Sequence, residues 1–155
     1  MKQKKPTQST ITNKKARFDY DIKTEYLAGI VLSGPETKSL RFSRGSLRGA
    51  FVTIKNGEAW LNNLQIMPMN TNAAHLTEDQ QTRARKLLLK RRELADIIAA
   101  KDQGNAIVPL ALLTKGRYIK VHIATAKGKK AYDKRAKIKE RDTHRDAKRD
   151  LKKFQ

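Results

Sequence analysis

Basic residues crowd both ends of this chain of 155 residues, whereas its large apolar side chains lie in the middle. Residues 1–17 contain six basic and no acidic residues, and residues 126–155 contain thirteen basic and five acidic residues, within a net charge of +20. Self-repulsion at this charge opposes compact folding, so a core is expected only where apolar residues gather. We therefore predict one domain over residues 13–125, a disordered basic arm at residues 1–12 and a basic tail at residues 126–155.

The charge balance also indicates the kind of partner. A net charge of +20 is typical of a protein that a polyanion neutralises, and nucleic acid is the leading choice. A membrane surface is the alternative, but it needs a helix with large apolar residues on one face, which the tail does not supply. The longest apolar run is far shorter than the ~20 residues that span a bilayer, and no signal peptide is expected. The absence of cysteine excludes disulfides and fits a cytoplasmic protein.

The middle of the chain predicts several β-strands. Phe18 to Leu32 is rich in β-branched and aromatic residues, which suits a long strand with a bend at Gly29. Two β-rich runs joined by Asn56 and Gly57 predict a hairpin, because a type I′ turn needs positive φ at both positions.

Two later runs alternate apolar and other residues and predict two further strands. They cover residues 108–112 and 119–123, with Lys115–Gly116 at the turn between them. The alternation points Lys120 and His122 away from the core.

Two helices are predicted beside these strands. Glu36–Arg41 reads as a short helix, since Pro35 fits the first turn. Thr77 is suited to cap a helix start, and Arg83–Ala100 has apolar residues near 3.6-residue spacing, which predicts a long amphipathic helix with a basic outer face.

Together these elements predict a mainly β fold with helices. At least five strands in about 110 residues indicate a small antiparallel β-barrel, closed or partly closed, of the oligonucleotide-binding type. An α+β sandwich, with the long helix on an open sheet, is the alternative. The basic tail has fair helix propensity but too few large apolar side chains for a buried stripe. We expect it to be disordered when free and helical once phosphates neutralise it.

Few residues are suited to catalysis or metal binding. The three histidines are far apart and show no metal-ligand spacing, and no phosphate- or dinucleotide-binding motif occurs, so no metal, cofactor or catalytic activity is expected. Arg83, Lys86 and Lys90 would lie on the outer face of the predicted long helix. Such a face is commonly only solvated, but beside a charge of +20 it indicates phosphate contact. Since aromatic residues make up only 6%, we expect recognition of folded RNA by shape and backbone.

Five segments together resemble small protein B, the SsrA-binding protein family of bacterial trans-translation. They are NKKARFDY (13–20), GIVLSGPETKSLR (29–41), NGEAWL (56–61), RARKLLLKRRE (83–93) and AKGKKAYDKRAKIKERD (126–142). The resemblance implies a barrel of the oligonucleotide-binding type. It further implies a monomer that binds the tRNA-like part of transfer-messenger RNA and carries it into the A site of a stalled ribosome. A basic structural protein of the ribosome is the alternative.

The resemblance also implies roles for individual residues. Positions on the RNA-binding side of the barrel, or supporting it, are matched by Tyr20, Glu36, Lys38, Arg41, Leu88 and Lys120. The tail that the family lays in the decoding centre and mRNA channel is matched by Gly128, Lys129, Lys130, Asp133, Lys134 and Arg135, and continues through Lys137, Lys139 and Arg141.

Two positions depart from the family pattern. Phe18 stands where the family usually has histidine, and Leu27 where it usually has a glutamate that contacts the RNA. Leu27 accepts no hydrogen bond, so we expect Glu25, two residues earlier on the same strand face, to replace that contact.

Overall fold

The computed structural model describes residues 10–114 and 116–154, and the rest of the predicted arm, residues 1–9, lies outside the described part. The strands are β1 (Ile11–Thr12), β2 (Tyr20–Ile30), β3 (Gly45–Ser46), β4 (Phe51–Lys55), β5 (Glu58–Asn62), β6 (Gln65–Ile66), β7 (Arg85–Leu88), β8 (Ala106–Leu113) and β9 (Lys120–Gly128). The helices are α1 (Lys14–Asp19), α2 (Gly34–Arg41), α3 (Glu78–Gln81), α4 (Arg91–Asp102), α5 (Ala131–Lys153) and the 3₁₀ helix η1 (Ala73–His75).

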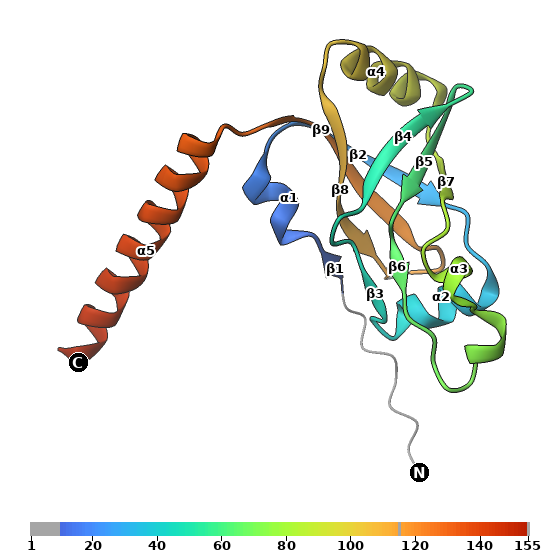
Figure 1. Ribbon diagram of the computed structural model, residues 1–155, viewed down its shortest axis with the longest axis horizontal. Coiled ribbons are helices and arrows are strands. Elements are labelled where there is room, and N and C mark those ends of the chain that lie inside the picture. Colours follow the sequence, from blue (N-terminus) through green and yellow to red (C-terminus); the bar gives the residue numbers. More distant parts are fainter. Residues whose placement is uncertain (1–9, 115, 155) are drawn as a thin grey trace.

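Seven of the strands form one curled antiparallel sheet (Figure 1). Its order is β1-β8-β9-β2-β7-β5-β4, and β3 pairs with β6 in a small separate sheet. The edge strand β4 also approaches β8, so the sheet curls into a partly closed barrel. The predicted mainly β fold with an antiparallel barrel is therefore confirmed.

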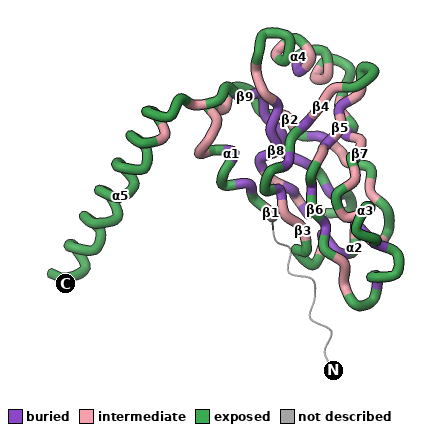
Figure 2. Tube along the Cα trace, viewed as in Figure 1, coloured by how far each residue is buried: buried purple, intermediate pink, exposed green. Residues whose placement is uncertain are grey.

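The hydrophobic core fills the inside of the barrel (Figure 2). Leu61, Leu112 and Ile123 come from three different strands and are fully buried there. Helix α4 packs on β8 and β9 and inserts Ile97 into the same core. A smaller cluster, which includes Ala16 of α1, lies where that helix packs on β8.

Strand β2 lies at the centre of the sheet. It pairs with β9 from Tyr20 to Gly29, with an irregularity between Ile22 and Thr24. At Gly29 it also begins to pair with β7, so this residue has a neighbour on each side.

The predicted hairpin and the short helix are both confirmed. Asn56 and Gly57 have φ values of 53° and 73° and join β4 to β5, as a type I′ turn requires. Ser33 caps α2, because its side chain accepts from the backbone N–H of Glu36, while the Glu36 carboxylate accepts from the backbone N–H of Ser33.

The prediction of one helix over Arg83–Ala100 is wrong in its first half. Residues 85–88 form strand β7 between β2 and β5, and helix α4 begins only at Arg91. Inside the strand, Arg85 and Leu87 are buried while Leu88 is exposed, which is the period of two of a β-strand. The buried arginine hid this alternation, because it reads as a surface residue in the sequence.

The barrel also extends beyond both predicted boundaries. Ile11 and Thr12 pair with Leu112 and Ala111, and the side chain of Ile11 packs against the hydrophobic core. Strand β9 continues to Gly128 and buries Ala126 completely. Helix α1 was also missed: Phe18 and Asp19 were assigned to the long strand, and residues 14–17 were placed in the domain without an element.

The predicted turn between β8 and β9 falls partly outside the described residues. Lys115 is not described, whereas Gly116 has a φ of 82°, as expected for a glycine in a turn.

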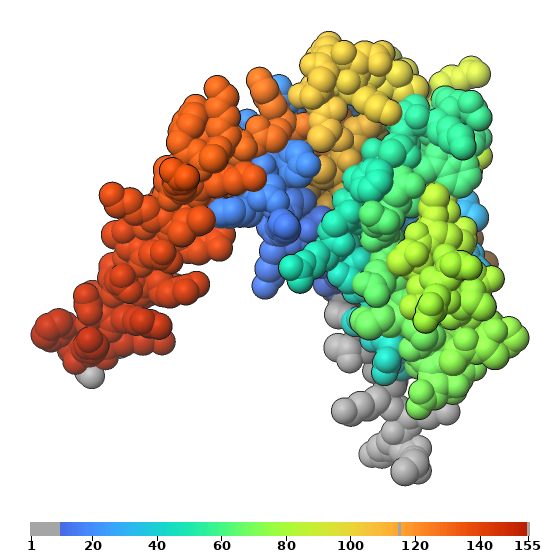
Figure 3. Space-filling view, viewed as in Figure 1, coloured from blue at the N-terminus to red at the C-terminus, as the bar shows by residue number. Residues whose placement is uncertain are grey.

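The tail forms the helix α5, which projects from the barrel (Figure 3). No residue of α5 is buried, so packing contributes little to its stability. Its transition from coil to helix on binding RNA stays a prediction.

Candidate nucleic-acid interface

An apolar row with lysines on both sides crosses the outer face of β9, β2 and β7. The side chain of Leu27 on β2 is 46% exposed, and that of Leu88 on β7 is 54% exposed. Lys120 on β9 is also exposed. It lies beside the two leucines, because it pairs with Gly29 of β2. Lys86 lies two residues before Leu88 and shares its face of the strand. The structure therefore brings together three of the predicted residues: Lys86, Leu88 and Lys120.

Gly29 provides the space over which Leu88 lies. A Cβ atom at position 29 would meet the Cβ of Leu88 at 3.2 Å and its Cδ1 at 3.6 Å. Since β2 and β7 pair at these two residues, a side chain at position 29 would push Leu88 away from the strand. Gly29 thus sets the height at which Leu88 projects from this face.

The row ends in a hollow beside the loop between β8 and β9. The hollow is lined by Thr10, Leu27, Leu113, Gly116, Arg117, Tyr118 and Lys120. Its aromatic wall is Tyr118, with the Arg117 guanidinium 5.6 Å from the ring centroid. An apolar floor beside an aromatic ring and a lysine suits an unpaired nucleotide, whose base needs a flat partner and whose phosphate needs a cation.

Arg41 of α2 fixes that loop in place. Its guanidinium donates to the carbonyl oxygens of Thr114 at 3.2 Å, Gly116 at 2.9 Å and Arg117 at 2.9 Å. The predicted residue Arg41 therefore supports the interface through the loop. Lys38, one turn earlier on α2, is exposed and remains suited to contact RNA directly.

Glu36, in the first turn of α2, is the centre of a buried group of ion pairs. Its side chain is 1% exposed, and its carboxylate accepts two 2.8 Å hydrogen bonds from Arg83 and one of 3.2 Å from the fully buried Arg85. Burial raises the pKa of Glu36, but bonds from Arg83 and from the backbone of Ser33, together with the charge of Arg85, hold it below its ordinary value. Burial likewise lowers the pKa of Arg85, and Glu36 opposes that change.

This network distinguishes the roles of two predicted residues. Glu36 was expected either to face the RNA or to support that side, and because its side chain is buried, only the supporting role fits. Arg83 lies in the segment between α3 and β7, where it pairs with Glu36; it was predicted on a helix face, and that placement is wrong. The remaining members of the prediction lie apart: Lys90 is exposed as the residue that precedes α4, and Tyr20 is half-buried against the smaller core cluster.

Glu25 is already engaged by neighbouring side chains. His122 Nε2 lies 2.9 Å from Glu25 Oε2, and Arg17 Nη1 of α1 lies 3.6 Å from Oε1. Both contacts lie near the surface, where such interactions contribute only a few tenths of a kcal/mol. An RNA donor would have to displace them, which makes Glu25 a weaker substitute for the family's glutamate than its position in the sequence suggested.

The predicted ribosome-binding residues follow the end of β9 and the first turns of α5. Gly128 is the last residue of β9, and Lys130 directly precedes α5. The exposed members on the helix are Asp133, Arg135, Lys137, Lys139 and Arg141, and Lys129 and Lys134 are half-buried.

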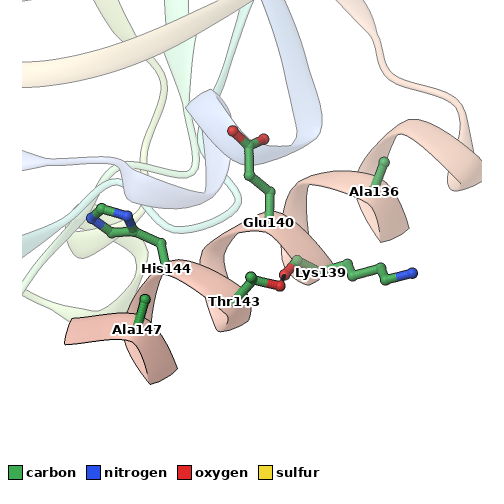
Figure 4. Close-up of a pocket in the computed structure, with 6 residues that line it drawn as sticks. All are labelled: Ala136, Lys139, Glu140, Thr143, His144 and Ala147. Atoms are coloured by element: carbon green, nitrogen blue, oxygen red, sulfur yellow. Dashed lines mark hydrogen bonds between the residues drawn. The ribbon is translucent and has the colours of Figure 1, made fainter. Parts of the chain in front are cut away.

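A groove along α5 is open to solvent (Figure 4). It is lined by Ala136, Lys139, Glu140, Thr143, His144 and Ala147, all on that one helix. The Thr143 hydroxyl donates to the Lys139 carbonyl at 2.9 Å, so it bonds within the helix. Among the described residues no second element lines the groove, so it is not an enclosed ligand site.

Sequence reasoning missed the hollow and the buried Arg85. Leu113 ends β8, and Arg117 and Tyr118 lie in the loop that follows, whose position depends on the distant Arg41. Tyr118 was considered as a side chain that could stack on a base, but no local pattern indicated that these residues form a hollow. Within residues 10–114 and 116–154 there is no group of three or more histidines and acidic residues that could hold a metal ion. In the same part of the chain, no helix has both the length and the apolar content needed to cross a membrane.

These features define a small, strongly basic β-barrel protein whose outer face and projecting cationic helix suit a nucleic acid. Comparison with known proteins identifies the family more closely. The model of the SmpB protein family matches residues 10–153, and the chain belongs to this family.

Its relatives include several SsrA-binding proteins. The protein of Synechococcus sp. (strain JA-2-3B'a(2-13)) is 46% identical over 143 residues, which cover 92% of each chain. That of Streptococcus mutans is 48% identical over 143 residues, which cover 92% of this chain and 91% of the relative. That of Pseudomonas putida (strain KT2440) is 48% identical over 150 residues, which cover 96% of this chain and 93% of the relative.

A solved structure is similar as well. A chain of the structure described as "tmRNA-SmpB: a journey to the center of the bacterial ribosome" superposes with a TM-score of 0.65 at 38% identity. The match covers 79% of this chain and 85% of that chain.

Proposed function

We propose that this chain binds the tRNA-like domain of transfer-messenger RNA and delivers it to the A site of stalled ribosomes for trans-translation. Family membership, the SsrA-binding relatives and the tmRNA-SmpB structure support this role. The observation that carries it is the apolar row of Leu27 and Leu88 between Lys86 and Lys120 on one sheet face.

That face combines the two contacts that folded RNA offers. Lysine ammonium groups neutralise phosphates, which provides most of the affinity and its salt dependence. Leu88 and Leu27 present apolar surface to ribose and base faces, and the hollow beside Tyr118 accepts an unpaired nucleotide. The buried ion pair of Glu36 with Arg85 fixes α2 relative to β7, so this face of the sheet already has its shape before RNA binds.

The tail supplies the second interface of this proposal. Helix α5 has 23 residues, a length of about 35 Å at the usual rise per residue, and its exposed lysines and arginines suit the ribosomal RNA of the decoding centre and mRNA channel. In this role the chain acts in the cytoplasm, associated with ribosomes, as a monomeric adaptor without catalytic activity of its own.

The test compares two exposed leucines. Leu88→Ala should weaken binding to the isolated tRNA-like RNA about fivefold to tenfold, because it removes apolar contact surface from the proposed interface. Leu151→Ala, on the far part of α5, is the matched control and should leave that affinity unchanged. Equal affinities for the two variants would contradict the proposal.

A second measurement separates the proposal from a structural ribosomal protein. Affinity purification of the tagged chain from growing cells should recover one RNA species of a few hundred nucleotides at about equimolar yield. Recovery of the chain in every ribosomal particle, without such an RNA, would favour the structural role.

A further inference from the structure

Cations at the start of the tail gather around the carboxyl-terminal end of α1. The Lys129 and Lys137 ammonium groups lie 3.5 and 3.4 Å from the carbonyl oxygen of Arg17, and both donate to it. Lys134 Nζ lies 3.4 Å from Asp19 Oδ1. Figures 1 and 3 show this part of the tail beside α1.

Two more contacts extend the same junction. The backbone N–H of Lys129 donates to the carbonyl oxygen of Asp19 at 2.9 Å. The Arg141 guanidinium lies 5.7 Å from the ring centroid of Phe18, within the range of a cation–π interaction. Because Lys134, Lys137 and Arg141 are spaced by three and four residues, they share one face of α5, and that face meets α1.

The chemistry of the junction explains why cations gather there. The last carbonyl groups of a helix have no partner within it and carry partial negative charge, so ammonium groups are favourable donors to them. The two lysines nevertheless crowd each other: the pKa of Lys137 is lowered from its ordinary value, chiefly by the close approach of Lys129 and the repulsion between their charges. An anion between the two ammonium groups would relieve this repulsion.

The far part of α5 has no comparable contacts. Among residues 142–154, the hydrogen bonds and ion pairs of the structure stay within the helix, as for Asp150 with Lys153. The tail therefore meets the barrel only through its first turns.

We propose that the carboxyl-terminal end of α1 is a docking site for residues 129–141 of the tail, and that phosphate groups compete with α1 for the same lysines. Docking holds the start of α5 beside the barrel and leaves the rest projecting. When phosphates bind Lys129 and Lys137, the tail is released from α1 and reorients. Only the identity of the natural competitor rests on the proposed function, because docking itself requires no RNA.

The test uses the full chain with one spin label. The sequence has no cysteine, so Ala147→Cys provides a single labelling site on the exposed part of α5, beyond the docking residues. Docking should broaden the backbone amide NMR signals of residues 17–19. An undocked tail would spend most of its time farther away, and the broadening would be small.

Two substitutions of equal charge then separate docking from general electrostatics. Asp19→Asn removes the partner of Lys134 and should lower the docking equilibrium about twofold to fivefold, because this half-buried ion pair still borders solvent. Asp21→Asn on β2 removes the same charge at an exposed position and should leave the broadening unchanged. Phe18→Leu, which removes the ring under Arg141, should act in the same direction as Asp19→Asn.

Inorganic tripolyphosphate is the competitor. It should abolish the broadening at a concentration where sodium chloride of equal ionic strength does not. Absent broadening in the labelled parent, or equal effects of Asp19→Asn and Asp21→Asn, would overturn docking. Equal effects of tripolyphosphate and chloride would overturn the competition. Because these samples contain no RNA, their failure would leave the proposed function standing, whereas failure of the Leu88 test would leave docking standing.

Discussion

Leu27 and Glu25 lie on the same exposed face of β2 but differ in what they already contact. The Glu25 carboxylate is bonded to His122 and lies near Arg17, whereas the Leu27 side chain borders the hollow beside Tyr118. A ligand gains little from a carboxylate that must first give up its partners, and gains more by covering apolar surface. The structure therefore shifts the expected contact from Glu25 to Leu27.

The first prediction ranks these two residues. Leu27→Ala should cost about 1 kcal/mol of affinity for the tRNA-like RNA, since the apolar surface that RNA covers becomes smaller. Glu25→Ala should cost less than half of that. Titration of both variants with the same labelled RNA, after circular dichroism shows equal folding, measures the ranking. A larger loss for Glu25→Ala would show that the RNA uses the carboxylate.

Glu36 gives a prediction for stability against pH. Its pKa lies below the ordinary value of 4.5, so the ionised form stabilises the fold at neutral pH, and this contribution is lost as pH falls below about 4.5. Glu36→Gln leaves the buried guanidinium of Arg85 without its counter-charge and should destabilise the barrel by about 3 kcal/mol at pH 7.

Denaturant unfolding at several pH values measures this effect. The difference between the parent and Glu36→Gln should shrink as pH falls below about 4.5. A Glu58→Gln variant serves as control, because the ion pair of Glu58 with Lys86 is exposed and should contribute less than 1 kcal/mol. A difference for Glu36→Gln that stays constant down to pH 3 would contradict the ionic role.

Among the helices and strands, those determined by neighbouring residues in the sequence could be predicted, and those that depend on distant partners could not. The hairpin at Asn56–Gly57 and the short helix α2 are encoded by adjacent residues, and both were predicted, although the cap at Ser33 was not. Strand β7 was assigned to a helix, because its assignment depends on pairing with β2 and β5 and on Arg85 finding the distant Glu36. Nothing in the sequence around Arg85 indicates that its side chain is buried.

The candidate interface divides in the same way. Leu88 and Lys120 were indicated by family resemblance, and their place on one face follows from pairing across β2. Tyr118 was considered for base stacking, but the hollow around it was not predicted, since its shape depends on a loop that the distant Arg41 holds.

The tail gives an element-scale prediction. Helix α5 buries no residue, and its isolated form would keep its basic excess while losing the contacts with α1. A synthetic peptide of residues 126–155 should therefore be mostly coil by circular dichroism in dilute buffer, and should gain helix when tripolyphosphate is added. A peptide that is already a stable helix without the anion would contradict this view of the tail.

At the scale of the whole molecule, the barrel and the tail bear separate interfaces. The core lies within the barrel, and the apolar row with its lysines needs only β9, β2 and β7. The tail contributes cations and almost no burial. The two parts meet where residues 129–141 contact the carboxyl-terminal end of α1, and Ala126 is the last buried residue in the described part of the chain.

Because Ala126 is buried, a truncation after Gly128 and one after Thr125 should differ in stability. A chain ending after Gly128 keeps all of β9 and every side chain that is buried among the described residues, so it should fold and bind the tRNA-like RNA with nearly the affinity of the full chain. It should nevertheless support no peptide tagging on stalled ribosomes, because the lysines and arginines proposed to contact ribosomal RNA are gone.

A chain ending after Thr125 is the matched comparison. It also removes the fully buried Ala126 and its pairing with Ile22 and Ala106, so its free energy of unfolding should fall by about 1 to 2 kcal/mol. Thermal unfolding, RNA titration and a tagging assay on the two truncated chains measure these three properties separately. Tagging by the chain that ends at Gly128 would show that the tail is dispensable, and loss of its RNA affinity would show that barrel and tail form one interface.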